Sequence, residues 1–115
     1  MKPASTLPEV LRLHDARDGR PENAAGIGEF WYEPEVWSLP LSPAARVLYA
    51  GLCSFLGHRE INRKDLRNTL KGSTDAEIAE ALGELEDSGL LRPTEEISGG
   101  APPGYTVRSV RDFRG

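Results

Sequence analysis

The chain has little of the side-chain chemistry on which catalysis and metal binding depend. Its 115 residues include one cysteine, Cys53, and two histidines, His14 and His58, in separate segments. Neither histidine has the spacing of a metal-ligand cluster or of a base beside a nucleophile. The glycines of SGGAPPG, residues 98–104, are not followed by a lysine or a helix, as a phosphate-cradling loop requires. We therefore expect no enzyme, no metal, no cofactor and no small-molecule substrate.

Long apolar runs are also absent. No stretch approaches the roughly 20 residues that span a bilayer, and the first residues, MKPASTLPEV, lack the apolar centre of a secretory signal. A single cysteine allows no intramolecular disulfide, which is typical of a reducing compartment. These absences predict a soluble protein of the cytoplasm with no membrane contact, and its length predicts one small domain.

The formal net charge is −4, whereas a general nucleic-acid binder is usually strongly basic. The charges are segregated along the chain, however. Residues 59–71 carry five bases and two acids, and residues 106–115 carry three bases and one acid. Between them, residues 73–89 carry six acids and neither lysine nor arginine. This segregation predicts separate basic and acidic surfaces.

Residues 1–28 contain three prolines and few apolar side chains, so we interpret them as an N-terminal arm. Thr6 and Glu9 have the spacing of a capping box, and apolar residues from Leu7 to Leu11 recur at helical intervals, which predicts one short helix over residues 6–14. The arm is either mobile or docked on a second copy or a partner.

Residues 29–41 are rich in aromatic side chains and are interrupted by two prolines. We expect this segment to be extended and to lie across the first helix. Aromatic rings beside basic residues can stack on nucleic-acid bases, but the charged neighbours here are all glutamates, which favours packing in the core or in a dimer. The aromatic residues are Phe30, Trp31, Tyr32 and Trp37, and the glutamates are Glu29, Glu33 and Glu35.

Start and stop signals divide the rest of the chain into three helices. Ser42 followed by Pro43 begins the first, which Gly57 ends; Asn62 caps the second, which Gly72 ends. Thr74 and Glu77 form a capping box at the start of the third, which Gly89 ends. Leu90 then begins a strand that turns at residues 98–104 and returns to Val110, forming a β-hairpin.

The segments LSPAARVLYAGLCSF, INRKDLRNTLKGSTDAEIAEALGELEDSGLLRP and GYTV resemble the winged helix-turn-helix of bacterial replication initiators, replisome organisers and related regulators. The resemblance covers residues 39–110. It implies a mainly α fold with a small β-hairpin (α+β), in which an arm (1–28) precedes a winged-helix domain (29–110, with the aromatic lead-in) and a short tail (111–115). It also implies a DNA-binding regulator of replication initiation or transcription whose third helix enters the major groove.

Two functions remain open, because the third helix is acidic where the family is usually basic. In the first, duplex DNA is bound by the second helix and the turn that follows it, and the C-terminal arginines Arg108, Arg111 and Arg114 add a contact. In the second, small and acidic residues of the third helix bind a protein, which could be a second copy. The DNA-binding candidates are Arg63, Lys64, Arg67, Lys71, Ser73 and Thr74; the partner-binding candidates are Ala76, Ala79, Glu80, Gly83 and Glu84.

Overall fold

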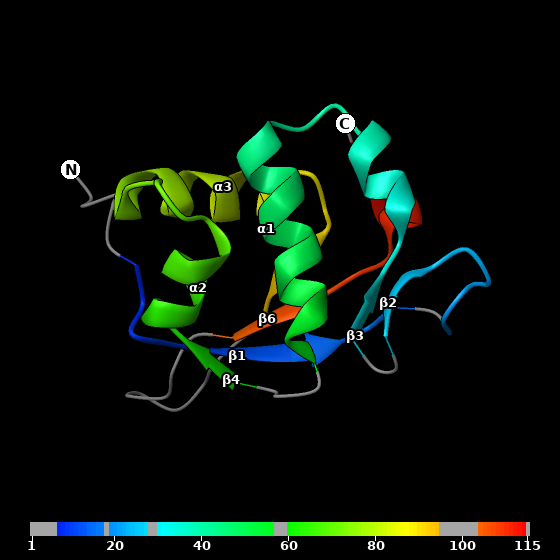
Figure 1. Ribbon diagram of the computed structural model, residues 1–115, viewed down its shortest axis with the longest axis horizontal. Helices are drawn as coiled ribbons and strands as arrows, with labels where there is room; N and C mark the ends of the chain where they lie inside the picture. The colour runs from blue at the N-terminus through cyan, green and yellow to red at the C-terminus, as the bar shows by residue number, and fades with distance from the viewer. Residues whose placement is uncertain (1–6, 18, 28–29, 57–59, 95–103, 115) are drawn as a thin grey trace.

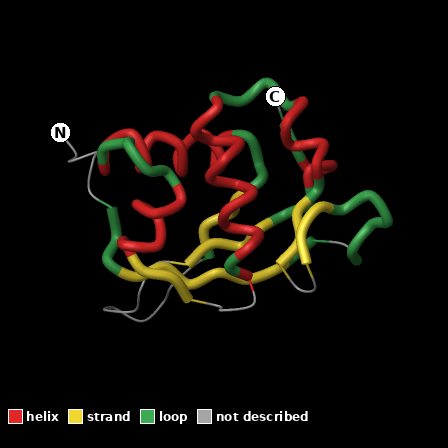
Figure 2. The backbone as a smooth tube through the Cα atoms, viewed as in Figure 1, coloured by secondary structure: helices red, strands yellow, loops and turns green. Residues whose placement is uncertain are grey.

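The computed structural model describes residues 7–17, 19–27, 30–56, 60–94 and 104–114. Within these ranges the fold is α+β: three α-helices cover one face of a four-stranded sheet, and a two-stranded sheet lies beside them (Figure 1). The backbone tube shows the same two layers, with the helices on one side and the strands on the other (Figure 2). None of the described helices is long and apolar enough to cross a membrane.

The three helix starts predicted from the sequence are confirmed. α1 (Pro43–Ser54) begins after Ser42, whose side chain accepts a hydrogen bond from the Ala45 N–H. α2 (Arg63–Thr69) begins after Asn62, which forms a capping box with Asp65. α3 (Asp75–Asp87) begins after Thr74, which forms a capping box with Glu77. Each cap satisfies a backbone N–H that the helix itself leaves unpaired.

The larger sheet has the order β4 (Glu60–Asn62), β1 (Val10–Asp15), β6 (Gly104–Val107) and β5 (Leu91–Pro93). β1 runs antiparallel to β4 and parallel to β6, and β5 pairs with β6 as an antiparallel hairpin. Both hairpin strands agree with the sequence prediction except at the end of the second, which stops at Val107 because Val110 begins a short 3-10 helix. Their connecting turn, with Glu95 and Glu96, lies outside the described residues.

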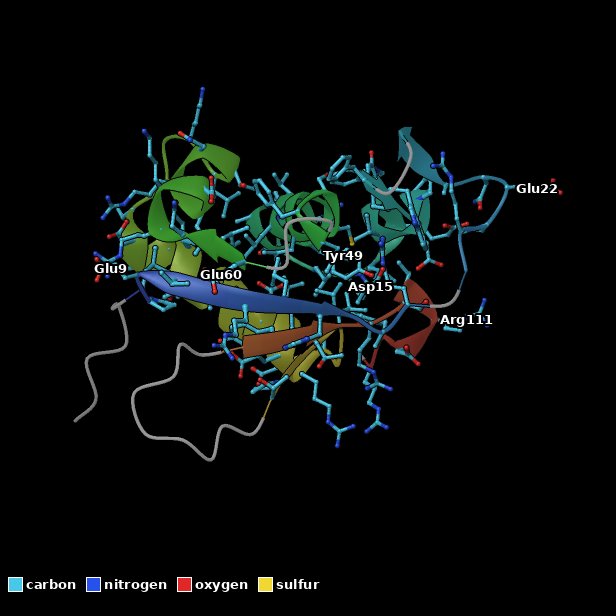
Figure 3. All side chains as sticks on the ribbon, turned by 90° about the horizontal axis from the view of Figure 1, so that it is seen from below. Glu9, Asp15, Glu22, Tyr49, Glu60 and Arg111 are labelled. Carbon is cyan, nitrogen blue, oxygen red and sulfur yellow. The ribbon has the colours of Figure 1, made fainter. Side chains whose placement is uncertain are left out.

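The short helix predicted near residues 6–14 is wrong, because residues 10–15 form the strand β1. Leu11 and Leu13 are buried whereas Arg12 and His14 are exposed, which is the period of two that a strand requires. Over so few residues, helical spacing and strand alternation fit the same apolar positions. β1 lies between β4 and β6 (Figure 3), so this part of the predicted arm is an inner strand of the sheet.

The aromatic segment lies against α1, as expected. β2 (Ala25–Ile27) pairs with β3 (Phe30–Tyr32) in the smaller sheet, and the short 3-10 helix η1 (Pro34–Ser38) follows. Trp31 and Val36 are buried, and the Glu33 carboxylate accepts a hydrogen bond from the Val110 N–H at 3.0 Å. This contact joins the segment to a second 3-10 helix, η3 (Val110–Asp112), near the C-terminus.

A buried arginine joins β1, β3 and α1. The Arg17 side chain is 1% exposed; its Nε donates to Asp15 at 2.9 Å and its Nη1 donates to the Trp31 carbonyl. The Trp31 ring stacks on the guanidinium at 3.7 Å. Burial alone would raise the pKa of Asp15, but the hydrogen bonds and the charge of Arg17 outweigh it, and this pKa lies below its usual value. Cys53 is buried nearby, and desolvation raises the pKa of its thiol to about 12.

Candidate nucleic-acid interface

The turn between α2 and α3 is tight. Gly72 has a φ of +89°, a left-handed conformation that favours glycine, and the Ser73 N–H donates to the Leu70 carbonyl at 3.1 Å. The second helix therefore ends where the sequence predicted, and α3 leaves the turn with its first residues beside α2. The two helices and their turn thus form a compact helix-turn-helix unit whose turn is open to solvent at Lys71 and Gly72.

One side of α3 carries a stripe of small, half-buried residues, Ala76, Ala79 and Gly83. At about 100° per residue Ala76 and Gly83 point away from Ile78, Leu82 and the other buried side chains of the helix, whereas Ala79 lies on a flank and packs partly against the core. A Cβ placed on Gly83 would meet nothing within 4 Å. The fold itself therefore does not require a small residue at position 83.

Two acids near the N-terminus of α3 accept hydrogen bonds from neighbouring groups. Asp75 accepts two hydrogen bonds from the Arg67 guanidinium, at 2.9 and 2.7 Å. These bonds lower the pKa of Asp75 and raise that of Arg67. Glu77 accepts a hydrogen bond from the Thr74 N–H at 2.7 Å, completing the capping box. Asp75 is therefore directed toward α2, and Glu77 toward the start of its own helix.

Two more acids connect α3 to its neighbours. The Glu84 carboxylate accepts hydrogen bonds from the N–H and the hydroxyl of Ser42, both at 2.7 Å, so it lies at the N-terminus of α1. Glu86 accepts a hydrogen bond from the Tyr105 hydroxyl of β6 at 2.9 Å. Burial, followed by this hydrogen bond, raises the pKa of Tyr105. Both carboxylates lie on the flanks of α3.

Only two acids, Glu80 and Asp87, are exposed beside the small-residue stripe without a partner among the described residues. Two unit charges about 10 Å apart in water interact by about 0.4 kcal/mol, so these two acids alone oppose a phosphate by about 0.8 kcal/mol before salt screening. Glu77, Glu84 and Glu86 add to this repulsion, because their hydrogen bonds come from uncharged groups and only Asp75 is paired with a cation among the described residues. The orientations of four of the six acids nonetheless reflect contacts within the fold. Which acids have partners within the fold could not be predicted from the sequence, because the partners of Glu84 and Glu86 are 42 and 19 residues away.

The four predicted cations of α2 and of the turn that follows it have different environments. Arg63 donates to the Leu7 carbonyl at 2.8 Å and its Nε is buried, so it belongs to the contact between α2 and the N-terminal segment. Arg67 is half exposed but paired with Asp75. Lys64 and Lys71 are exposed and have no partner among the described residues. Only these two remain from the predicted basic stripe for binding an anion without first breaking a contact.

The two predicted hydroxyl groups lie at the start of α3. Thr74 accepts a hydrogen bond from the Glu77 N–H at 3.1 Å and so completes the cap. Ser73 is half-buried in the turn, directly after the exposed residues Lys71 and Gly72. The structure therefore brings Lys71, Ser73 and Thr74 together at one end of the small-residue stripe.

A second group of cations lies at the opposite end of α3. Arg92, Arg108 and Arg114 line a groove of about 290 Å³ together with Asp87 and Gly89. Arg92 and Arg114 are exposed, and Arg108 is 3.6 Å from Asp112. The sequence had indicated Arg108 and Arg114 as additional contacts but not Arg92. The hairpin brings Arg92 and Arg108 together, and the Arg114 N–H donates to the Ser88 carbonyl at 2.6 Å, which places Arg114 in the same groove although it follows Arg92 by 22 residues.

The small-residue stripe therefore has cations at both ends. α3 has 13 residues and is about 20 Å long at 1.5 Å per residue. Lys71 lies in the turn that precedes α3, and the three arginines line the groove at the end of α3. These four cations lie at the two ends of α3, whereas Lys64 lies in the first turn of α2, at the end of that helix farther from the turn.

A separate, acidic groove lies between α1 and α3. It has a volume of about 390 Å³ and is lined by Ser42, Ala44, Glu77, Glu80, Ala81 and Glu84. Of the predicted partner-binding residues, Glu80 and Glu84 line this groove, whereas Ala76, Ala79 and Gly83 do not. The predicted set therefore divides between the groove and the small-residue stripe.

Comparison of the chain with protein-family models, curated proteins and solved structures finds no match in any of the three. A function has to be inferred from the geometry and the charges described above.

Proposed function

We propose that the chain is a winged-helix domain that binds duplex DNA, as a bacterial regulator of replication or transcription does. α2, the turn and α3 correspond to the helix-turn-helix, and β5 with β6 corresponds to the wing. The observation that supports DNA most directly is the small-residue stripe of α3 with cations at both of its ends.

The major groove of B-DNA is about 12 Å wide and has a phosphate strand on each side. A helix about 20 Å long that enters it therefore brings its two ends close to the two backbones. Lys64 and Lys71 are available for one backbone, and Arg92 and Arg114 for the other. Contacts of this kind position a protein on DNA but carry little sequence information.

The remaining candidate residues serve the same interface. Ser73 and Thr74 lie at the N-terminus of α3, a position that favours phosphate, and a phosphate there would have to compete with the capping box that pairs the N–H groups of Thr74 and Glu77. Ala76, Ala79 and Gly83 let the base edges approach the helix backbone closely. Glu80 and Asp87 are acceptors, which suits the amino group of cytosine.

The proposal is tested by fluorescence anisotropy of a labelled duplex, titrated with the protein at several salt concentrations. The logarithm of affinity falls with the logarithm of salt by about 0.9 for every phosphate neutralised. Lys71→Glu and Arg92→Glu each remove one contact, so each lowers the slope by about 1.

Arg12→Glu is the matched control, because it makes the same change of charge at an exposed position on the sheet face opposite the helices. This control keeps the wild-type salt slope. Equal weakening by all three substitutions would show that DNA responds only to the net charge and would contradict the named surface.

The acidic groove between α1 and α3 favours a second candidate function, the binding of a basic protein segment. Glu80 is exposed in this groove and Ala44 and Ala81 provide an apolar floor. Replacing Glu80 with lysine weakens such a complex but strengthens DNA binding, because it removes an acid beside the small-residue stripe. If replacing Glu80 with lysine weakens DNA binding instead, the assignment of the stripe to DNA is contradicted.

A further inference from the structure

Arg67 of α2 and Asp75 of α3 form a side-on ion pair across the helix-turn-helix. The Arg67 Nε donates to one carboxylate oxygen of Asp75 at 2.9 Å, and Nη2 donates to the other oxygen at 2.7 Å. Both side chains are accessible to solvent, since 53% of the Arg67 side chain and 37% of the Asp75 side chain are exposed. The pair therefore lies at the surface, within reach of a ligand that approaches α2.

Arg67 lies between the two exposed lysines that are proposed to contact one DNA strand. Lys64 precedes it by three residues on α2, and Lys71 follows it by four residues in the turn. At about 1.5 Å per residue, Lys64 and Arg67 are about 4.5 Å apart along the helix axis. One strand of DNA carries a phosphate for about every 3.4 Å of its own axis. A strand that contacts both lysines therefore also passes Arg67.

The ion pair removes the attraction of Arg67 for that strand. A guanidinium and a carboxylate joined by two hydrogen bonds form a strong contact, and the pair has no net charge. Asp75 is also fixed in place, because it is the first residue of α3 and Thr74 and Glu77 on either side of it form the capping box. A phosphate that replaces Asp75 loses translational freedom, whereas Asp75 belongs to the same chain and does not.

The fold gains little from this pair. Ion pairs between exposed side chains contribute little to the free energy of unfolding. α2 and α3 are already held together by the core, in which Leu66 and Leu70 of α2 and Ile78 of α3 are buried. The main effect of Asp75 is therefore on the charge that α2 presents to a ligand.

We propose that Asp75 is an internal competitor for DNA, which holds Arg67 away from the phosphates and so limits the sequence-independent part of binding. The inference rests on the proposed function and describes its regulation. Phosphate contacts supply essentially all of the non-specific affinity of a DNA-binding protein, whereas contacts with base edges carry the sequence information. One phosphate contact fewer weakens binding to every duplex alike and raises the relative weight of the base contacts.

Replacing Asp75 with asparagine tests the inference, because it removes the charge and keeps the shape of the side chain. Anisotropy titrations at several salt concentrations compare wild type with Asp75→Asn on two labelled duplexes of unrelated sequence. The released Arg67 adds one phosphate contact, so the salt slope becomes steeper by about 0.9 on both duplexes. The advantage of Asp75→Asn over wild type thus grows about eightfold for a tenfold drop in salt concentration.

Two further variants separate the release of Arg67 from the mere loss of an acid. Glu80→Gln is the matched control, because it neutralises an exposed acid of α3 that has no partner among the described residues. It raises the affinity slightly and keeps the wild-type slope. The double variant Arg67→Gln, Asp75→Asn exchanges the ion pair for two uncharged side chains and returns to the wild-type slope. Circular dichroism verifies that every variant is folded.

The outcomes distinguish this inference from the proposed function. If wild type binds DNA and Asp75→Asn has the same slope or a shallower one, the inference is overturned and the proposed function stands. A steeper slope that persists in the double variant also overturns it, since Arg67 is then not the cation that is released. If neither wild type nor Asp75→Asn binds DNA at low salt, the proposed function fails together with the inference.

Discussion

At the scale of single residues, the Asp15–Arg17 pair is a contact whose contribution to stability depends on pH. Arg17 is 1% exposed and Asp15 is 43% exposed, so removing the carboxylate leaves a buried cation with fewer partners. We expect Asp15→Asn to lower the free energy of unfolding at pH 7 by about 1–2 kcal/mol, between the values for exposed and buried pairs.

The pH dependence of this loss follows from the lowered pKa of Asp15. A carboxyl group with a lowered folded-state pKa stabilises the fold fully above its unfolded-state pKa, near 3.8, and this stabilisation is lost as the pH falls through the folded-state pKa. Urea unfolding of wild type and Asp15→Asn should therefore differ most near neutral pH and converge at strongly acidic pH. A difference that stays constant from pH 7 to pH 2 would rule out the ionised pair as its cause.

The fold gives no reason for a glycine at position 83. It lies inside α3 without a left-handed φ, and a Cβ there meets no atom. Gly83→Ala should raise the free energy of unfolding by about 0.5–1 kcal/mol, since alanine favours helix over glycine by about this amount. Thermal melting tests this, and Gly51→Ala is the contrasting variant. A Cβ on Gly51 overlaps the Thr69 methyl group, so that substitution destabilises the α1–α2 contact.

At the scale of elements, Glu84 connects the middle of α3 to the first turn of α1. Its carboxylate accepts from both the backbone and the side chain of Ser42. Glu84→Ala should lower the free energy of unfolding by about 1–2 kcal/mol, the usual cost of losing a charged acceptor at a helix start. Glu80→Ala, one turn earlier and without a partner among the described residues, should change stability by less than about 0.5 kcal/mol. Equal losses in chemical denaturation would contradict this difference between the two acids.

Helix starts could be predicted from the sequence because a cap depends on residues within three positions of each other. Ser42, Asn62 and Thr74 carry their signals locally. The strand β1 could not be predicted from the sequence. It forms a strand because it pairs with β6, about 90 residues away, and its short apolar pattern also fits a helix. Other features depend on residues that are likewise distant in the sequence. These are the hydrogen-bond partners of Arg63, Glu84 and Glu86 and the groove lined by Arg92 and Arg114.

At the scale of the whole molecule, the acidic net charge and the proposed DNA surface are compatible. Four of the six acids of α3 lie in its capping box or on flanks that face α1, α2 and β6, and the small-residue stripe between these flanks has cations at both ends.

The salt-dependent anisotropy titration of wild type with duplex DNA tests the DNA surface most directly. If Lys64, Lys71, Arg92 and Arg114 contact phosphates, binding at low salt should weaken with a slope of about −3 to −4, at about 0.9 for each contact. Absence of binding at low salt, with the protein folded and at near-millimolar concentration, would contradict the proposed function.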